Sequence, residues 1–339
     1  MVIRGSIASV GQALSDSEAA ANEGAGDNLV VTGELVFKKS WGNSFGFVHV
    51  RGSQGMPVYS KMEPDVAPGL PGYSYGSNDV SLGMSDTVEF AAAFWSYTMF
   101  DALTFTVGKI DISAFFETNN LANDSSRQFL AYPFVNNPTV RFAFHEPGYI
   151  LKVHPGDFFY AQLGVFEDRE QPEELVAEME QKFYIAEIGF HYEPFEEEGN
   201  FRFLAWNSDY FEQGGFAFNL DQMFGETFGM FMRYGTLRDA IYTVPADPTV
   251  MPVSDTESAF SIGTRINFGE EHHIGLGYAL QSPADPDMSA MTWLEGYVSF
   301  AIDEGTFATL DLQYVINPEF DSERDGLWIP GIRFFAQFL

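Results

Sequence analysis

The chain ends in a stretch whose apolar and polar residues alternate. From Trp328 to Leu339, one face of an extended strand is apolar and the opposite face carries Gly331, Arg333 and Gln337. A closing strand with an aromatic residue near its end suits a transmembrane β-barrel, because lipid does not tolerate an open sheet edge. An edge strand of a soluble sandwich fits this stretch as well, so the rest of the chain has to decide.

Similar alternating runs recur along the whole chain, bounded by clusters of Gly, Pro, Asn and Asp. They predict sixteen strands, at about 2–10, 29–39, 44–53, 85–98, 102–110, 148–154, 157–166, 182–193, 200–208, 214–222, 226–235, 257–268, 272–281, 290–302, 306–316 and 328–338.

The connections between these strands alternate in length. The long ones lie at 11–28, 54–84, 111–147, 167–181, 236–256, 282–289 and 317–327, with short turns between them and 209–213 as the exception. Bacterial outer-membrane barrels combine an even strand count with tight periplasmic turns and longer extracellular loops. The sequence therefore predicts one all-β domain over 1–339, a transmembrane antiparallel β-barrel of 16 strands with both termini on the periplasmic side.

Composition agrees with a barrel. The aromatic share is 16%, yet the mean hydropathy is only −0.09, as expected when each strand has one apolar and one polar face. No run approaches the roughly 20 apolar residues of a spanning helix.

The absence of cysteine excludes disulfides and Cys-ligated metals, and a net charge of −31 argues against nucleic acid as a partner. The first residues lack a secretory signal, so we expect a mature chain or a sequence missing its start.

Short motifs lie at Gly108–Asp111, Phe116–Asn119, Ala122–Asp124, Gln128–Leu130, Asn136–Pro138, Gly164–Phe166, Asn200–Trp206, Phe228–Gly235 and Leu312–Pro318, and the chain has a closing Arg333. Together these motifs resemble those of the OprB-type carbohydrate-selective porins. The resemblance covers about 30–339 and implies a sixteen-stranded outer-membrane channel that admits sugars. Leu339 is an extra residue after the terminal Phe338, and the chain is more acidic than is typical of sugar porins.

A sugar filter requires planar hydrogen-bonding groups and aromatic faces. An ionisable side chain facing lipid costs several kcal/mol at the membrane midplane, so charged strand residues are expected to face the lumen. The pore-lining or substrate candidates are Arg202, Arg233, Arg265, Arg333, Glu295, Glu187, Trp293 and Trp206. Each arginine could instead pair with a neighbouring carboxylate.

The long connection 111–147 is the predicted constriction loop, since loops folded into large barrels narrow them. Its candidates for the narrowest point are Asp111, Glu117, Asn119, Asn123, Asp124 and Arg127. The alternative is a loop that packs only on itself, in which Asn and Asp serve turn geometry.

No cofactor, metal site or catalytic constellation is predicted. Acidic residues gather at 170–180, where a solvated helix face is the simplest interpretation, and His272 and His273 have no carboxylate at ligand spacing. The six histidines are scattered, and nucleophile and phosphate-loop motifs are absent, so the chain is not expected to be an enzyme.

The sequence thus favours a passive outer-membrane channel for small hydrophilic solutes, with sugars implied by the resemblance. A cation-preferring general porin is the second hypothesis, because of the acidic charge. A barrel that sheathes a partner protein such as a cytochrome is the third. Expected partners are outer-membrane lipid, lipopolysaccharide and the permeating sugars or ions. The sequence does not decide whether the chain forms a homo-oligomer.

Overall fold

The protein is a closed antiparallel barrel of sixteen strands, as predicted. The computed structural model describes residues 1–13, 28–54, 88–140, 142, 145–168, 181–194, 197–240, 242–243, 253–254, 256–269, 271–323 and 325–338. The barrel strands are β1 (Val2–Gln12), β2 (Asn28–Trp41), β3 (Ser44–Gln54), β4 (Val88–Met99), β5 (Leu103–Ile110), β6 (Glu146–Val153), β7 (Phe159–Glu167), β8 (Lys182–Tyr192), β9 (Gly199–Ser208), β10 (Gln213–Phe224), β11 (Phe228–Arg238), β14 (Thr256–Phe268), β15 (His272–Pro283), β16 (Met291–Asp303), β17 (Thr306–Ile316) and β18 (Leu327–Phe338).

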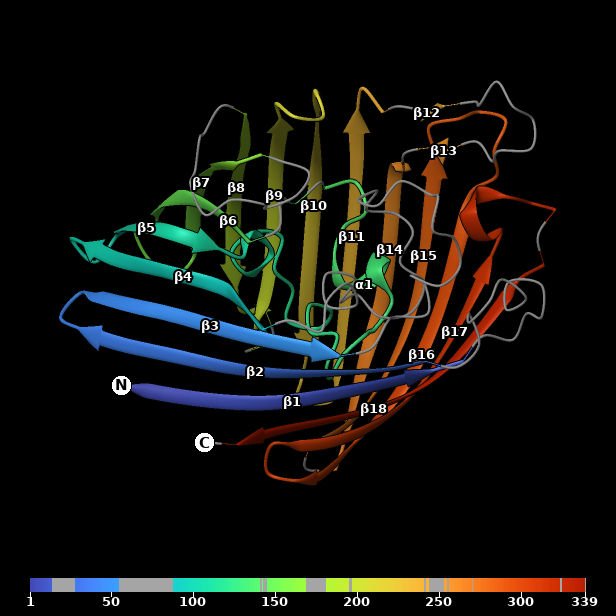
Figure 1. Ribbon diagram of the computed structural model, residues 1–339, viewed down its shortest axis with the longest axis horizontal. Coiled ribbons are helices and arrows are strands. Elements are labelled where there is room, and N and C mark those ends of the chain that lie inside the picture. The colour runs from blue at the N-terminus through green and yellow to red at the C-terminus, as the bar shows by residue number, and fades with distance from the viewer. Residues whose placement is uncertain are drawn as a thin grey trace.

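The first and last strands close the barrel. β1 pairs with β18 in an antiparallel register that runs from Gly5 opposite Phe338 to Gln12 opposite Gly331. All other barrel strands pair with their neighbours in chain order. The two ends of the chain consequently lie side by side at one end of the barrel (Figure 1). The barrel sheet, as formed by its sixteen described strands, has no unpaired edge, which is the condition for a sheet to exist in lipid.

The strands have an apolar outer face, and many of their inner positions are polar. On β17, Leu310 and Leu312 are 57% and 45% exposed on the outer wall. Between and beside them, Thr309, Asp311 and Gln313 point inward and are buried. This period of two follows from the pleat of the strand. The inner residues are buried because chain material fills part of the barrel.

The short turns use residues that tolerate a left-handed backbone. Gly42, Gly225, Gly269 and Gly305 all have positive φ angles, and each lies in a turn of the barrel between consecutive strands. Glycine reaches this conformation without the steric penalty that a Cβ atom brings. The short connections predicted at these points are confirmed.

Within the described ranges, four further elements were not predicted: a two-stranded sheet, a one-turn α-helix, and two 3-10 helices at Ile112–Ala114 and Pro318–Phe320. A two-stranded sheet, β12 (Tyr242–Thr243) and β13 (Val253–Ser254), lies within the segment expected to be a simple loop. A one-turn helix α1 (Tyr132–Val135) lies in the predicted constriction loop. None of the described helices is long and apolar enough to cross a membrane. The acidic segment at 170–180 lies outside the described residues.

Candidate functional site: the lumen and its inward-folded loop

The connection after β5 turns into the barrel. It starts with a short 3-10 helix, Ile112–Ala114, whose cap is Asp111: the backbone N–H and the hydroxyl of Ser113 donate to Asp111 Oδ1 at 3.1 and 2.7 Å. Phe115, which follows, packs edge-on against Phe94 of β4. Farther along, α1 lies against β14 and β15, and Figure 1 shows it within the ring of strands. The loop therefore runs across the lumen.

Glu117 is the first anchor of this loop. Its backbone N–H donates to Glu187 on β8 at 2.7 Å, and its Oε1 accepts from Arg233 on β11 at 2.8 Å. Asn219 on β10 donates to the Glu117 carbonyl oxygen at 2.8 Å and to Oε1 at 3.0 Å. Glu117 is 1% exposed. Burial raises the pKa of its carboxyl to about 7, although the Arg233 guanidinium acts in the opposite direction.

A second anchor holds the segment around α1. The backbone N–H groups of Leu130 and Ala131 donate to the two carboxylate oxygens of Glu295 on β16, at 2.6 and 2.8 Å. Arg233 spans both anchors, because its Nη1 donates to the carbonyl oxygen of Phe134 in α1. Both oxygens of the Glu295 carboxyl group are therefore occupied by main-chain N–H groups of the loop.

A third anchor comes from the closing half of the barrel. Arg333 on β18 donates to the Ser125 carbonyl oxygen at 2.6 Å and to Asp311 on β17 at 3.3 Å. His273 on β15 donates to the Arg127 carbonyl oxygen at 2.9 Å. Arg127 itself extends over the rings of Phe307 and Phe335. The middle of the loop is thus fastened to β18 and β15 through the main-chain carbonyl oxygens of Ser125 and Arg127.

Two apolar clusters complete the seal between the loop and the wall. One joins loop residues such as Phe129 and Phe134 to Phe231, Trp293 and Tyr297 on the strands. The other joins the early part of the loop to the wall formed by β5 to β11. Its members are Ile110, Ile112, Phe116, Val140, Ile150, Phe166, Phe183, Ile185, Leu204, Trp206, Ala217 and Leu237. Through this packing the loop covers much of the inner wall along β7 to β18.

The predicted pore-lining residues are therefore mostly covered by the loop. Arg233, Arg333, Glu187 and Glu295 hold it by hydrogen bonds. Trp206 and Trp293 lie in its apolar clusters. Arg202 pairs with Asp221 at 2.6 Å, and Arg265 donates to Asn267 at 2.8 Å. All eight remain candidates, but the contacts of most of them are with protein groups.

The predicted constriction residues fall into a buried group and a group that keeps contact with solvent. Glu117 and Asn119 are buried, and Asn119 Oδ1 accepts from the backbone N–H groups of Leu121 and Ala122. The others keep contact with solvent: they are Asp111, Asn123, Asp124 and Arg127, the last two paired at 2.9 Å. Asp111 pairs with His145 at 3.6 Å. Burial alone would raise the pKa of Asp111, but His145 and Ser113 lower it to about 2.

The charged residues on the open side of the lumen were not among the residues predicted from the sequence. On β2 and β3, Glu34 accepts from Arg51 at 3.0 Å and lies 3.5 Å from His49. Their side chains are 31%, 14% and 13% exposed, against 1% for both Arg233 and Glu117. His49 and Arg51 alternate with Val48 and Val50, so the rule of alternating faces could have found them.

Aromatic rings lie beside these charges. Phe47 stacks on Phe94 with ring centroids 4.8 Å apart, and Phe45 meets Phe94 edge-on at 6.0 Å. Lys38 Nζ lies 4.5 Å from the centroid of Phe45. Since Phe94 also contacts the loop residue Phe115, these rings are on the inner face. The open wall can therefore offer both aromatic surface and hydrogen-bonding groups to a solute.

No group of three or more potential metal ligands occurs among the described residues. Chemically, the open wall brings together hydrogen-bond donors, acceptors and ring faces, which can make weak contacts with a polar solute.

Comparison with solved structures agrees with the architecture. OprB of Pseudomonas putida, in its high pH structure, superposes with a TM-score of 0.73 over 99% of this chain and 93% of that one, at 12% sequence identity. A mutant of the Rh. blastica porin gives a TM-score of 0.58 over 98% and 99% of the two chains, at 9% identity. The chain has a porin fold. At these identities the likeness concerns the fold alone.

Sequence comparison adds less. No family model matches the chain. An uncharacterized protein of Aquifex aeolicus (strain VF5) is 28% identical over 210 residues, which are 61% of this chain and 58% of that protein. This chain thus spans under two thirds of its relative. The OprB-type resemblance of the sequence is matched by a porin fold, while membership of that family stays a prediction.

Proposed function

We propose that the protein is an outer-membrane channel through which small hydrophilic solutes diffuse passively, with carbohydrates as the favoured class. One observation carries the proposal. The loop after β5 covers the inner wall along β7 to β18, whereas the charged and aromatic side chains of β2 to β4 keep contact with solvent. A sixteen-stranded barrel is wide enough for an aqueous passage beside such a loop.

The chemistry of the open wall supports sugars. Ring faces such as Phe47 and Phe94 can pack against the C–H side of a pyranose, and Arg51 with Glu34 provides planar donors and acceptors for hydroxyl groups. Solute binding has to stay weak for conduction to be fast. The porin fold also supports outer-membrane insertion with the short turns and both termini on the periplasmic side.

The test is conductance in planar bilayers with glucose and maltose as probes. We expect each sugar to reduce the current in a concentration-dependent way, and Phe47→Ala and Arg51→Gln to weaken the block. Phe37→Ala, on the outer face of β2, is the matched control and should leave the block unchanged. A protein that conducts ions without any sugar block would refute the carbohydrate preference.

The second candidate is a cation-preferring general porin, favoured by the net charge of −31. The same recordings distinguish it, because a salt gradient would then give a strongly cationic reversal potential. The open wall favours weak selectivity, since the Glu34 carboxylate is paired there with the Arg51 guanidinium.

A further inference from the structure

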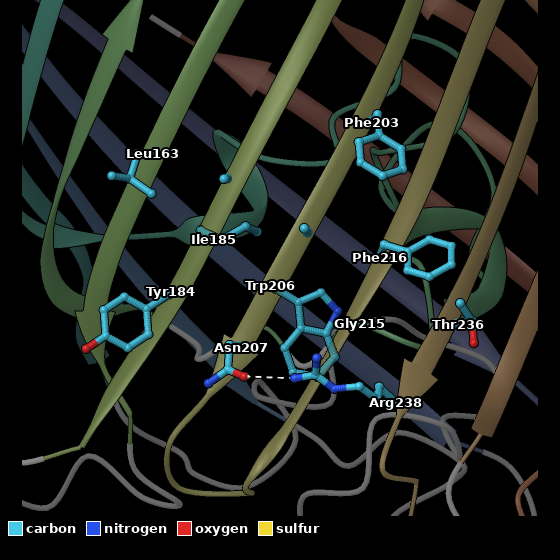
Figure 2. Close-up of a pocket in the computed structure, with 12 residues that line it drawn as sticks. Leu163, Tyr184, Ile185, Phe203, Trp206, Asn207, Gly215, Phe216, Thr236 and Arg238 are labelled. Atoms are coloured by element: carbon cyan, nitrogen blue, oxygen red, sulfur yellow. Dashed lines mark hydrogen bonds between the residues drawn. The ribbon is translucent and has the colours of Figure 1, made fainter.

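The outer wall across β7 to β11 contains a groove, and strand register explains it. Leu163, Ala186, Ala205 and Phe216 face each other in one row across four neighbouring strands. The two alanines form a low floor between larger side chains on either side. Across the barrel wall this produces a depression of about 800 Å³ that faces outward (Figure 2).

The rows on either side of this floor differ in chemistry. One neighbouring row lies nearer the end of the barrel where β9 ends at Ser208 and β11 ends at Arg238. It consists of Tyr184, Asn207, Gly214 and Arg238, which supply hydroxyl, amide and guanidinium groups. Toward the middle of the barrel, the next row is Ile188, Phe203, Phe218 and Tyr234, which is largely aromatic. The groove is therefore polar at one end and apolar along the rest.

Arg238 provides the charge at the polar end. Its Nη2 donates to Asn207 Oδ1 at 3.3 Å, and its Nε donates to Asp239 Oδ2 at 3.0 Å. The side chain is 70% exposed. A guanidinium has five N–H donors, so it can bind another anion while it keeps both bonds. Figure 2 shows Arg238 beside Asn207 at the end of the groove near the connecting loops.

From this arrangement we propose that the groove binds one phosphate-bearing lipid of the loop-side leaflet. An acyl chain lies over Ala186 and Ala205, and the lipid phosphate accepts hydrogen bonds from Arg238. Hydrogen-bond complementarity selects this occupant over a second copy of the chain, because Arg238 keeps N–H donors beyond its bonds to Asp239 and Asn207, and they lie at one end of an acyl-sized groove, where a phosphate headgroup can accept from them. The inference requires only that the outer wall faces lipid, so it stands apart from the identity of the permeating solute.

The experiment is native mass spectrometry of the detergent-solubilised full chain, titrated with dimyristoyl phosphatidylglycerol or with dimyristoylglycerol. The two probes share their acyl chains and differ in the phosphate headgroup. We expect one tightly retained phosphatidylglycerol, bound about tenfold more tightly than dimyristoylglycerol, since hydrogen bonds to a charged group contribute about that factor. Arg238→Gln should abolish the difference between the probes and leave the acyl-dependent binding intact.

Ala205→Phe, which fills the floor, should weaken binding of both lipids. Its matched control is Ala308→Phe, the same enlargement on the outer face of β17 opposite Phe334, which should change nothing. Heat-dependent gel migration confirms that each variant is folded, and the exposed Arg238 can be replaced even where Ala205→Phe does not fold. Equal lipid binding by the wild type and both groove variants would overturn the proposal. So would a shift of Ala205→Phe from oligomer to monomer with lipid binding unchanged, because the groove would then be an interface between copies.

Discussion

Glu117 and Arg233 are 116 positions apart in the sequence, yet their Oε1 and Nε atoms lie 2.8 Å apart with both side chains 1% exposed. This buried pair joins the inward-folded loop to β11. Removing one member of such a pair leaves the other charge buried without compensation, which costs far more than the pair itself contributes. The pair therefore fixes the position of the loop more than it adds to net stability.

Stability should depend on pH through Glu117. Its pKa in the folded protein is about 7, above the ordinary value of 4.5, so the folded state holds a proton between these values that the unfolded state has lost. The free energy of unfolding should therefore fall by about 3 kcal/mol as pH rises from about 4.5 to 7, and then level off. Urea unfolding at a series of pH values measures it. Glu117→Gln should flatten this part of the profile, and an unchanged slope in that variant would contradict the assignment.

Asp111 should act in the opposite direction at lower pH. Its pKa is about 2 in the folded protein against an ordinary 3.8, so its contribution is fully present above about 4 and is lost as pH falls toward 2. The expected loss is about 2 kcal/mol. Asp111→Asn should remove this acid limb in the same urea series while leaving the limb near neutral pH in place. If both limbs vanish together, the two carboxyls are not independent.

Arg333→Met should destabilise the barrel by about 3 kcal/mol, because Asp311 and the Ser125 carbonyl oxygen lose their buried donor. Arg265→Met is the control. Arg265 is only half-buried and donates to Asn267, so its loss should cost under about 1 kcal/mol. Unfolding midpoints in urea give both values. Single-channel conductance should also become noisier in Arg333→Met, since the loop has lost an anchor, and a quiet channel would argue against that role.

Substitution of a turn glycine measures the free-energy cost of a left-handed backbone conformation. Gly42 has a φ of +58°, and a Cβ atom added there meets nothing within 4 Å, so Gly42→Ala should cost about 1 kcal/mol through the backbone alone. Gly33→Ala, in the extended β2 strand with equally open surroundings, is the matched control and should be neutral or slightly stabilising. Equal effects of the two substitutions would show that the left-handed conformation is not the cause.

The barrel could be predicted from the sequence because its rule is local. Alternation within each strand, as in Leu310, Asp311 and Leu312, reflects which face meets lipid, and glycines such as Gly225 mark the turns. The sixteen strands and the alternation of loop lengths follow from these signals alone. The same rule correctly places Arg233 and Arg333 on the inner face.

The rule does not say what those inner residues contact. Whether Arg233 meets solute or the loop depends on the path of residues far away in the chain, and no local pattern encodes that path. His273 is an example: it lies near the start of a predicted strand, and it donates to the carbonyl oxygen of Arg127, 146 positions earlier in the chain. Glu34 and Arg51, by contrast, were within reach of the alternation argument.

The seam between β1 and β18 also links closure of the ring to the position of the loop. Arg333 lies on β18, the strand that pairs with β1, and the same side chain donates to the Ser125 carbonyl oxygen of the loop. A change that displaces β18 would therefore open the ring and release this anchor together.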